Sequence, residues 1–155
     1  MRKASISLKV NGTSRRVEVA ANDTLLEVLR DKLGVKSAKV GCDRGDCGTC
    51  TVLLDGRSVR SCLVLAMEAD GCEVSTLEGL SKGGGTALQK AFVKHNSFQC
   101  GFCAPGVILS ATELLRKNPK PSRHEIQEAI AGNLCRCTGY TPIIEAIEDA
   151  AGRKA

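Results

Sequence analysis

The sequence contains no tryptophan, and aromatic residues make up only 3% of its 155 residues. Proteins that bind single-stranded nucleic acids stack bases on aromatic side chains that stand among basic residues. Here lysines and arginines are scattered without aromatic neighbours, and the formal net charge is +5. We therefore expect no nucleic-acid partner.

Long apolar runs are also missing. No stretch approaches the roughly 20 apolar residues that a membrane-spanning helix requires. The amino terminus alternates polar and apolar residues, as in Ser5-Ile6-Ser7-Leu8, and so lacks the apolar core of a secretion signal. The sequence predicts a folded cytoplasmic protein with no membrane partner.

Residues that usually carry out substrate chemistry are sparse as well. The chain has two histidines, and we find no Ser-His-Asp set, phosphate-binding loop or paired carboxylates at a recognisable spacing. His95 and His124 have no partner pattern around them, and His124 lies inside a helix-capping sequence. We expect no catalytic residue on this chain.

Cysteine, in contrast, is abundant, with nine residues. Cytoplasmic thiols stay reduced and the number is odd, so metal binding is favoured over a disulfide framework. Cys72 stands apart in a predicted strand, where a small buried side chain is expected. The other eight form two sets of four, namely Cys42, Cys47, Cys50 and Cys62, and Cys100, Cys103, Cys135 and Cys137.

The sequence changes character near residue 80. Upstream, strand-like alternation and one helical segment predict a small α+β domain. Its elements in order are a hairpin of 6–10 and 17–19 with a connection longer than two residues, a helix opened by the capping box Thr24–Glu27, a hairpin of 51–54 and 57–62 turned at Asp55-Gly56, and a strand over 72–75.

Residues 81–86 are rich in glycine and predict a flexible linker. Downstream, four segments carry apolar residues at helical spacing. They begin near Leu88, at Ala104, at the capping box Ser122–Glu125, and at Thr141-Pro142, where threonine is expected as the N-cap. Four amphipathic helices with short connections predict a four-helix bundle.

Three cysteines of the first set lie in the glycine-rich loop of residues 41–50, spaced C-x4-C-x2-C. Glycine lets the chain wrap tightly enough for three thiolates to converge. The turn at Asp55-Gly56 should return Cys62 to the same loop. This spacing is that of a plant-type [2Fe-2S] site. Zinc, the alternative, usually takes two paired C-x2-C knuckles.

The second set is spaced C-x2-C and C-x-C. Predicted helices over 104–117 and 122–134 would each be about 20 Å long, and the short turn between them makes them antiparallel. The end of the second helix then lies beside the start of the first, which brings the four cysteines together. On spacing alone, this site suits zinc and an iron–sulfur cluster comparably.

Three segments together resemble the small iron–sulfur subunit of molybdenum hydroxylases, the family of xanthine dehydrogenase, aldehyde oxidoreductase, carbon monoxide dehydrogenase and 4-hydroxybenzoyl-CoA reductase. They read GCDRGDCGTCTV over 41–52, QCGFCAPG over 99–106 and GNLCRCTGY over 132–140. The resemblance covers nearly the whole chain, with Thr49 a minor departure where alanine is common. It implies a β-grasp ferredoxin-like domain over residues 1–80 and a helical domain over 87–155, each holding one [2Fe-2S] cluster through its four cysteines.

The resemblance also implies an electron-transfer subunit of an oxidoreductase complex. In this family a large subunit binds molybdopterin, expected here as the cytosine dinucleotide, and a medium subunit binds FAD, in a heterotrimer or its dimer. Electrons then pass from molybdopterin through both clusters to FAD, and Gln99 matches a residue that contacts the pterin. The alternatives are a reductase-branch enzyme with reversed flow, a stand-alone two-cluster carrier and a structural zinc protein.

Overall fold

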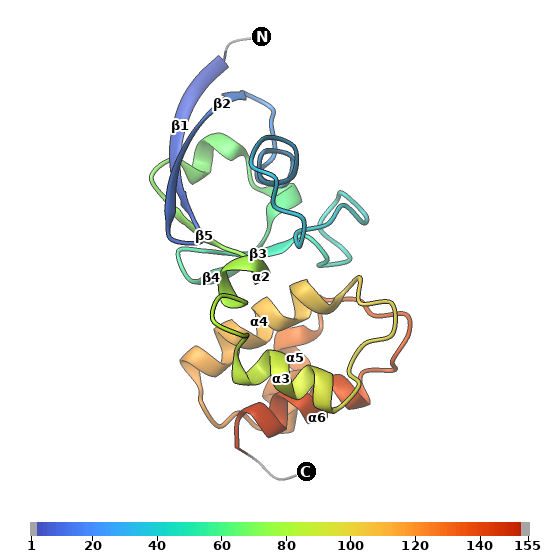
Figure 1. The fold of residues 1–155 in the computed structure, drawn as a ribbon. Coiled ribbons are helices and arrows are strands. Elements are labelled where there is room, and N and C mark those ends of the chain that lie inside the picture. Colours follow the sequence, from blue (N-terminus) through green and yellow to red (C-terminus); the bar gives the residue numbers. More distant parts are fainter. Residues whose placement is uncertain (1–2, 153–155) are drawn as a thin grey trace.

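The protein is described from a computed structural model that places residues 3–152. The predicted domain ranges also include residues 1–2 and 153–155, which lie outside the described residues. A five-stranded sheet forms the half drawn at the top of Figure 1, and helices α3 to α6 form the half below it. The α+β class expected from the sequence is confirmed.

The sheet has the strand order β2-β1-β5-β3-β4. Strand β5 is short, yet it pairs with β1 in parallel and with β3 antiparallel, so it joins the two hairpins. The sequence predicts a strand at this place but not its central position. The strands are β1 Lys3–Val10, β2 Thr13–Ala20, β3 Thr51–Leu54, β4 Arg57–Arg60 and β5 Glu73–Ser75.

The first hairpin turns more tightly than its pattern predicts. Val10 pairs with Thr13, so only Asn11 and Gly12 connect the strands. Both have positive φ, 51° and 83°, as the two central residues of a type I′ turn require. The prediction of a longer connection is wrong because the first four residues of β2 are all exposed and carry no apolar alternation.

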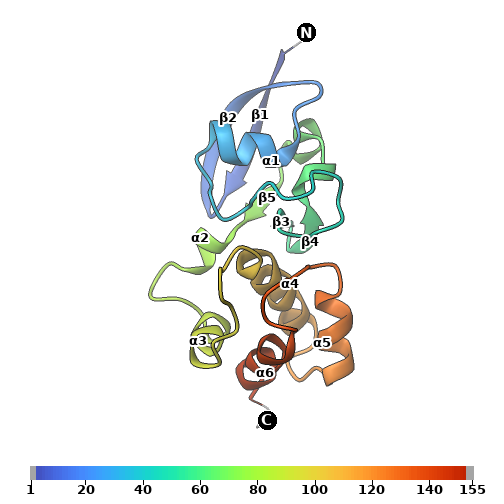
Figure 2. The same cartoon turned by 90° about the vertical axis from the view of Figure 1, so that its right-hand side faces the viewer.

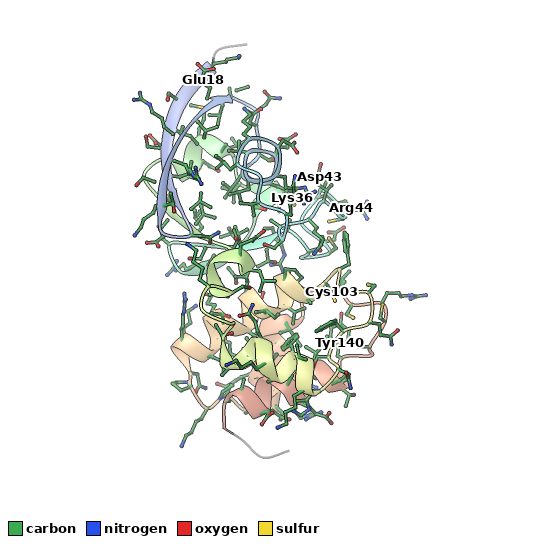
Figure 3. All side chains as sticks on the ribbon, in the orientation of Figure 1. Glu18, Lys36, Asp43, Arg44, Cys103 and Tyr140 are labelled. Carbon is green, nitrogen blue, oxygen red and sulfur yellow. The ribbon has the colours of Figure 1, made fainter. Side chains whose placement is uncertain are left out.

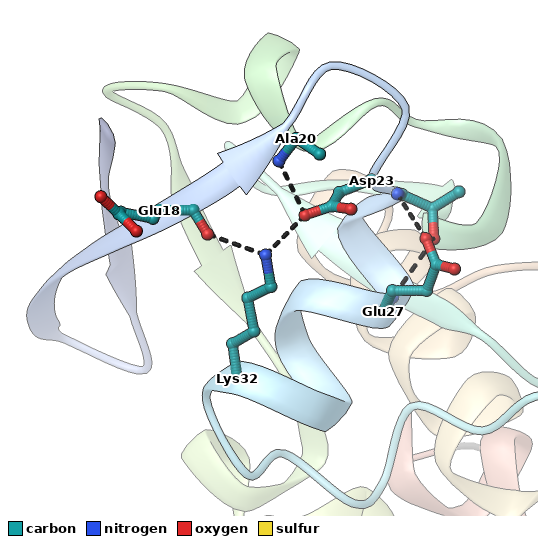
Figure 4. A network of polar contacts seen from close by, with 6 residues as sticks. Glu18, Ala20, Asp23, Glu27 and Lys32 are labelled. Carbon is teal, nitrogen blue, oxygen red and sulfur yellow. Dashed lines mark hydrogen bonds and ion pairs between the residues drawn. The ribbon is translucent and has the colours of Figure 1, made fainter. Parts of the chain in front are cut away.

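The helix after β2 starts at the predicted capping box. Thr24 accepts a hydrogen bond from the Glu27 amide and Glu27 accepts one from the Thr24 amide. Helix α1 (Leu25–Glu27) continues as the π-helical turn η1 (Val28–Lys32). There the Lys32 ammonium donates to the Glu18 carbonyl and to Asp23, which ties the helix to β2 (Figure 4).

The second hairpin leads into irregular structure sooner than predicted. Strand β4 ends at Arg60, and Cys62 lies in a 3₁₀ turn, η2 (Ser61–Leu63), which is followed by η3 (Ala66–Ala69). One apolar core lies between this sheet and α1, and it includes Leu8, Leu25 and Val52.

A second core holds the helical half together. It is formed by side chains such as Phe92, Ile126 and Ile147, and it also receives Leu77 and Leu80 from α2. None of the helices within residues 3–152 is long and apolar enough to cross a membrane. The helices are α2 Leu77–Leu80, α3 Ala87–Lys94, α4 Ala104–Lys117, α5 Arg123–Ile130 and α6 Thr141–Ala150.

Two helix boundaries differ from the sequence prediction. Helix α5 ends at Ile130 rather than at residue 134, because the chain turns there and the Asn133 amide donates to the Ile130 carbonyl. The N-cap of α6 is Tyr140 rather than Thr141. Tyr140 has a φ of +71°, in the left-handed region.

Candidate metal centres

Seven of the eight cysteines in the two sets are carried by three loops that lie on one side of the molecule. The loop of residues 41–50 extends from the sheet half, and the loops of residues 96–103 and 131–140 extend from the helical half in the same direction (Figures 1 and 2). Figure 3 labels Asp43, Arg44, Cys103 and Tyr140 along this side. Both candidate sites therefore share one face, close to where the two halves meet.

In the first set, the hairpin brings its two ends together as expected. Cys50 ends the loop just before β3, and Cys62 follows β4, so the turn at Asp55-Gly56 returns one to the other. Their sulfurs are 3.4 Å apart and both side chains are buried. On the outer side of the loop, the Cys47 amide lies 3.3 Å from the Cys42 sulfur.

Glycines make this wrapping possible. A β-carbon at Gly41 would lie 2.8 Å from the Cys47 sulfur. At Gly45, where φ is +88°, a β-carbon would lie 2.4 Å from a methyl carbon of Leu63. At Gly41 a side chain would displace the Cys47 sulfur. At Gly45 the exposed Leu63 side chain can move aside, and the positive φ is what favours glycine.

In the second set, the cysteines come from both helical-half loops. Cys103 is the residue that caps the amino end of α4, and its side chain interacts with that of Cys135. The Cys100 and Cys137 sulfurs are 3.7 Å apart and both residues are exposed. Although α5 is shorter than predicted, the chain after it returns to the start of α4 and brings the four cysteines together.

In each set, the thiol pKa is raised at one cysteine and lowered at another. We call Cys62 and Cys103, where burial raises it, the inner thiols, and Cys42 and Cys100, where it is lowered, the outer thiols. Burial raises the pKa of Cys62 to about 12, and burial raises that of Cys103 to about 12 as well, with Cys50 and Cys135 adding to the effect. Backbone amides of Cys47 and Arg44 lower the pKa of Cys42 to about 7. The Phe102 amide lowers the pKa of Cys100.

The sulfurs are arranged as pairs rather than as groups around one point. Within residues 3–152, no three Cys, His, Asp or Glu side chains gather closely enough to hold a single ion. Two thiolates on one tetrahedral metal, with bonds of about 2.3 Å, lie roughly 3.8 Å apart. A [2Fe-2S] cluster takes its four cysteines as two such pairs, one on each iron. The paired thiols therefore fit a two-iron cluster better than one zinc ion.

Gln99 is exposed and directly precedes Cys100. Its amide nitrogen donates to the Cys137 carbonyl at 3.0 Å. A side-chain amide has a second N–H and a carbonyl oxygen, so this contact leaves Gln99 with groups to offer to another molecule. The contact also places Gln99 beside the outer pair of the second set.

The remaining candidates are partly corrected by the structure. His124 is solvent-exposed and lies 3.4 Å from Glu128. His95 does have a partner, because its Nε2 is 2.9 Å from an oxygen of Asp149. Cys72 is partly exposed rather than buried, since it precedes β5 in a surface turn.

The sequence reasoning missed Asn133, which is buried in the middle of the third motif. Its amide nitrogen donates to the Gly48 carbonyl and to the Thr51 hydroxyl, at 3.0 and 3.2 Å. Its amide oxygen accepts from Ser110 at 2.8 Å. Beside it, the Leu134 amide donates to the Cys47 carbonyl at 2.9 Å. The only sequence signal was an amide residue between a glycine and two cysteines.

Two family profiles match the chain. Residues 8–80 match a 2Fe-2S iron-sulfur cluster binding domain, and residues 76–148 match a [2Fe-2S] binding domain. Together they extend over most of the sequence and each contains one of the two cysteine sets.

Among curated proteins, the nicotine 6-hydroxylase small subunit of Paenarthrobacter nicotinovorans is 50% identical over 151 residues, covering 97% of this chain and 92% of its own. The xanthine dehydrogenase iron-sulfur-binding subunit of Escherichia coli O157:H7 is 45% identical over 148 residues, covering 94% and 92%. Among solved structures, a chain of quinoline 2-oxidoreductase from Pseudomonas putida 86 superposes with a TM-score of 0.93 at 47% identity, covering 97% and 94%.

Proposed function

Because this chain belongs to the family of small iron–sulfur subunits of molybdenum hydroxylases, we propose that it relays electrons between a molybdopterin site and an FAD held by partner subunits. The observation that carries the proposal is the pairing of the eight thiols. Cys50 pairs with Cys62 and Cys42 with Cys47, while Cys100 pairs with Cys137 and Cys103 with Cys135. Two [2Fe-2S] clusters, when bound, supply one-electron transfer. The chain itself binds, buries and spaces them.

Cys42, Cys47, Cys50 and Cys62 would hold the first cluster, and Cys100, Cys103, Cys135 and Cys137 the second. In the first set Cys50 and Cys62 are buried and the other two thiols are half-buried. In the second set Cys103 and Cys135 are half-buried, whereas Cys100 and Cys137 are exposed. A metal site needs deprotonated thiols, and the backbone amides that contact Cys42 and Cys100 favour that form.

The two cysteine sets also correspond to two domains. Residues 1–80 would form the ferredoxin-like β-grasp domain, 81–86 the linker and 87–155 a four-helix bundle domain. In support, the buried residues of the first core lie between Ile6 and Val74 and those of the second between Leu88 and Ile147.

The partners would be a large subunit that binds molybdopterin, as its cytosine dinucleotide, and a medium subunit that binds FAD, in a heterotrimer or its dimer. Exposed apolar side chains beside the second set, Phe98, Phe102 and Leu134, support a covering partner. Gln99 would reach the pterin from the same surface. Nine free thiols favour a reducing compartment such as the cytoplasm.

The test is anaerobic purification of the chain with the polypeptides that accompany it, followed by metal analysis and electron paramagnetic resonance (EPR). We expect four irons per chain, two distinct [2Fe-2S] signals after reduction, and molybdenum in a larger co-purifying subunit. Zinc in place of iron would overturn the proposal. Purification of a two-cluster chain alone, with no molybdenum-containing subunit, would favour the stand-alone carrier instead.

A further inference from the structure

The loop that carries Cys135 and Cys137 is closed by a tyrosine hydroxyl. The Tyr140 hydroxyl accepts a hydrogen bond from the Cys135 amide at 2.8 Å. It also lies 3.1 Å from the Asn133 carbonyl, to which it donates. Tyr140, at the end of the loop, therefore holds the backbone of Asn133 and Cys135. Cys135 and Cys137 both lie in the segment that this contact closes.

Tyr140 adopts an unusual backbone conformation to reach this place. Its φ of +71° follows a φ of +64° at Gly139, and a bulky residue is seldom found in the left-handed region. Such a conformation persists only where the surroundings over-determine it. Here the Tyr140 carbonyl accepts from the Ile144 amide in α6, and its ring packs against the helical core. A glycine would make the same turn without strain, so the side chain has a use beyond the turn.

The hydroxyl engages the backbone amide of Cys135 itself, whereas the amides of Cys137 and Thr138 are the ones that bond to the Cys135 sulfur. Only the α and β carbons separate the Cys135 amide nitrogen from the sulfur. A second hydroxyl, that of Thr138, lies 3.2 Å from the sulfur itself. Thr138 already accepts from the Tyr140 amide, and a ligating thiolate has no proton, so Thr138 would donate to the sulfur. The Thr138 hydroxyl thus places positive charge beside the Cys135 sulfur, whereas the Tyr140 hydroxyl places a negative oxygen beside the Cys135 amide.

We propose that Tyr140 is a positioning residue that holds the reduction potential of the second site down by occupying the Cys135 amide. This inference rests on the proposed function, because it concerns a cluster bound at Cys135. Hydrogen bonds and dipoles aimed at the sulfurs stabilise the more negative, reduced state and raise the potential. When its N–H is bonded to the tyrosine oxygen, the Cys135 amide presents less positive charge to the sulfur. The partial negative charge of that oxygen also lies near the sulfur, and both effects lower the potential.

The experiment compares Tyr140→Phe with Thr138→Val in the purified complex. Each variant is titrated potentiometrically while the two EPR signals are followed, and iron is measured in parallel. Tyr140→Phe keeps the ring and should shift one signal to a higher potential, leaving the other unchanged. Thr138→Val removes a donor to the same sulfur and should shift that same signal to a lower potential.

Opposite shifts of one signal exclude a general loosening of the loop, because water entry would raise the potential in both variants. Selective loss of two of the four irons from Tyr140→Phe would mean that Tyr140 is needed to hold the cluster rather than to set its potential, and would overturn the inference. Equal potentials in Tyr140→Phe and the parent complex would overturn the inference, as would shifts of the same sign in both variants or unfolding of Tyr140→Phe with loss of all iron. Absence of [2Fe-2S] signals from the parent complex would instead contradict the proposed function.

Discussion

At the scale of single residues, Gly48 combines a positive φ with a close approach of two backbone segments. It follows Cys47 in the first loop and has a φ of +70°. A β-carbon there would lie 2.2 Å from the Gly132 carbonyl oxygen, in the other half of the molecule. From that half, a β-carbon at Gly106 would lie 2.4 Å from the Gly48 carbonyl oxygen. Glycine at these positions lets the two cysteine loops come into backbone contact.

Gly48→Ala should therefore destabilise the fold more than an alanine at a glycine that has a positive φ but no close neighbour. We expect a loss of about 3 kcal/mol in the free energy of unfolding, from backbone strain together with the clash. Gly12→Ala is the matched control, because Gly12 has a φ of +83° but no atom within 4 Å of its β-carbon position. It should cost about 1 kcal/mol. Denaturant unfolding measures both, and equal losses would contradict the importance of the close approach.

Gln99→Leu should slow the transfer of electrons from molybdenum while both clusters still assemble. The substitution removes the amide that contacts the Cys137 carbonyl and the groups it offers to a partner. The measurement is single-turnover reduction of the clusters by substrate, with iron content as the check on assembly. Gln127→Leu, which changes an exposed glutamine on α5, is the control. A normal rate in Gln99→Leu would refute the assignment.

Among the elements, α2 holds the segment that leads into the first cysteine loop. Its Glu78 accepts hydrogen bonds from the backbone amides of Lys36 and Ser37, each at 2.9 Å, and from the Thr76 hydroxyl at 2.6 Å. Burial raises the pKa of Glu78, but hydrogen bonds from the Ser37 hydroxyl, the Thr76 hydroxyl and the Ser37 amide outweigh it and lower the pKa to about 2. The segment that leads into the cysteine loop is thus held by one carboxylate.

Glu78→Gln should weaken the fold at neutral pH by about 2 kcal/mol, because hydrogen bonds to a charged acceptor are lost. A carboxyl with a depressed folded-state pKa stabilises the fold above its unfolded value, about 4.3. The difference between parent and variant should therefore be full above pH 4.3 and disappear as the pH falls toward 2. Denaturant unfolding across this range measures it, with Glu18→Gln on exposed β2 as control. A difference that does not change with pH would contradict the ionic role.

The sequence predicted those elements whose signals are local. The capping boxes at Thr24 and Ser122 and the range 104–117 all correspond to observed helix starts and bounds. The central place of β5 and the early end of α5 depend on partners distant in sequence, which local patterns do not encode. Likewise, spacing identified the eight candidate cysteines, whereas Asn133 and the Tyr140 hydroxyl matter only through contacts that the folded chain creates.

In the whole molecule, the two halves meet along a polar seam, which we define by Asn133, Leu134, Arg60 and their partners. Arg60 donates to the Gly132 carbonyl at 2.7 Å and to the Thr51 hydroxyl at 3.0 Å. With the bonds of Asn133 and Leu134 described above, the seam joins the segments that carry Cys47 and Cys135. The spacing of the two sites is therefore set by hydrogen bonds rather than by an apolar interface alone.

Asn133→Ala should loosen this seam. It removes the acceptor of the buried Ser110 hydroxyl and the hydrogen bond to the Gly48 carbonyl, which Thr51 continues to satisfy. The loss should cost about 2 kcal/mol. Calorimetry should show the two halves unfolding in separate transitions, where the parent unfolds in one. Asn118→Ala, in an exposed turn where the amide contacts Glu125, is the control and should change little. A single transition at the parent temperature would contradict the role of Asn133.

The central position of β5 also determines when the sheet can form during synthesis on the ribosome. The sheet cannot unite its two hairpins until residues 73–75 have been synthesised, yet all four cysteines of the first set precede them. At about 5–20 residues per second, the interval between Cys62 and Ser75 lasts roughly 1–3 s. During that interval the nascent chain presents reactive thiols without the sheet that will enclose them. We therefore expect iron delivery to this site to follow translation of β5 rather than accompany the emergence of the cysteines.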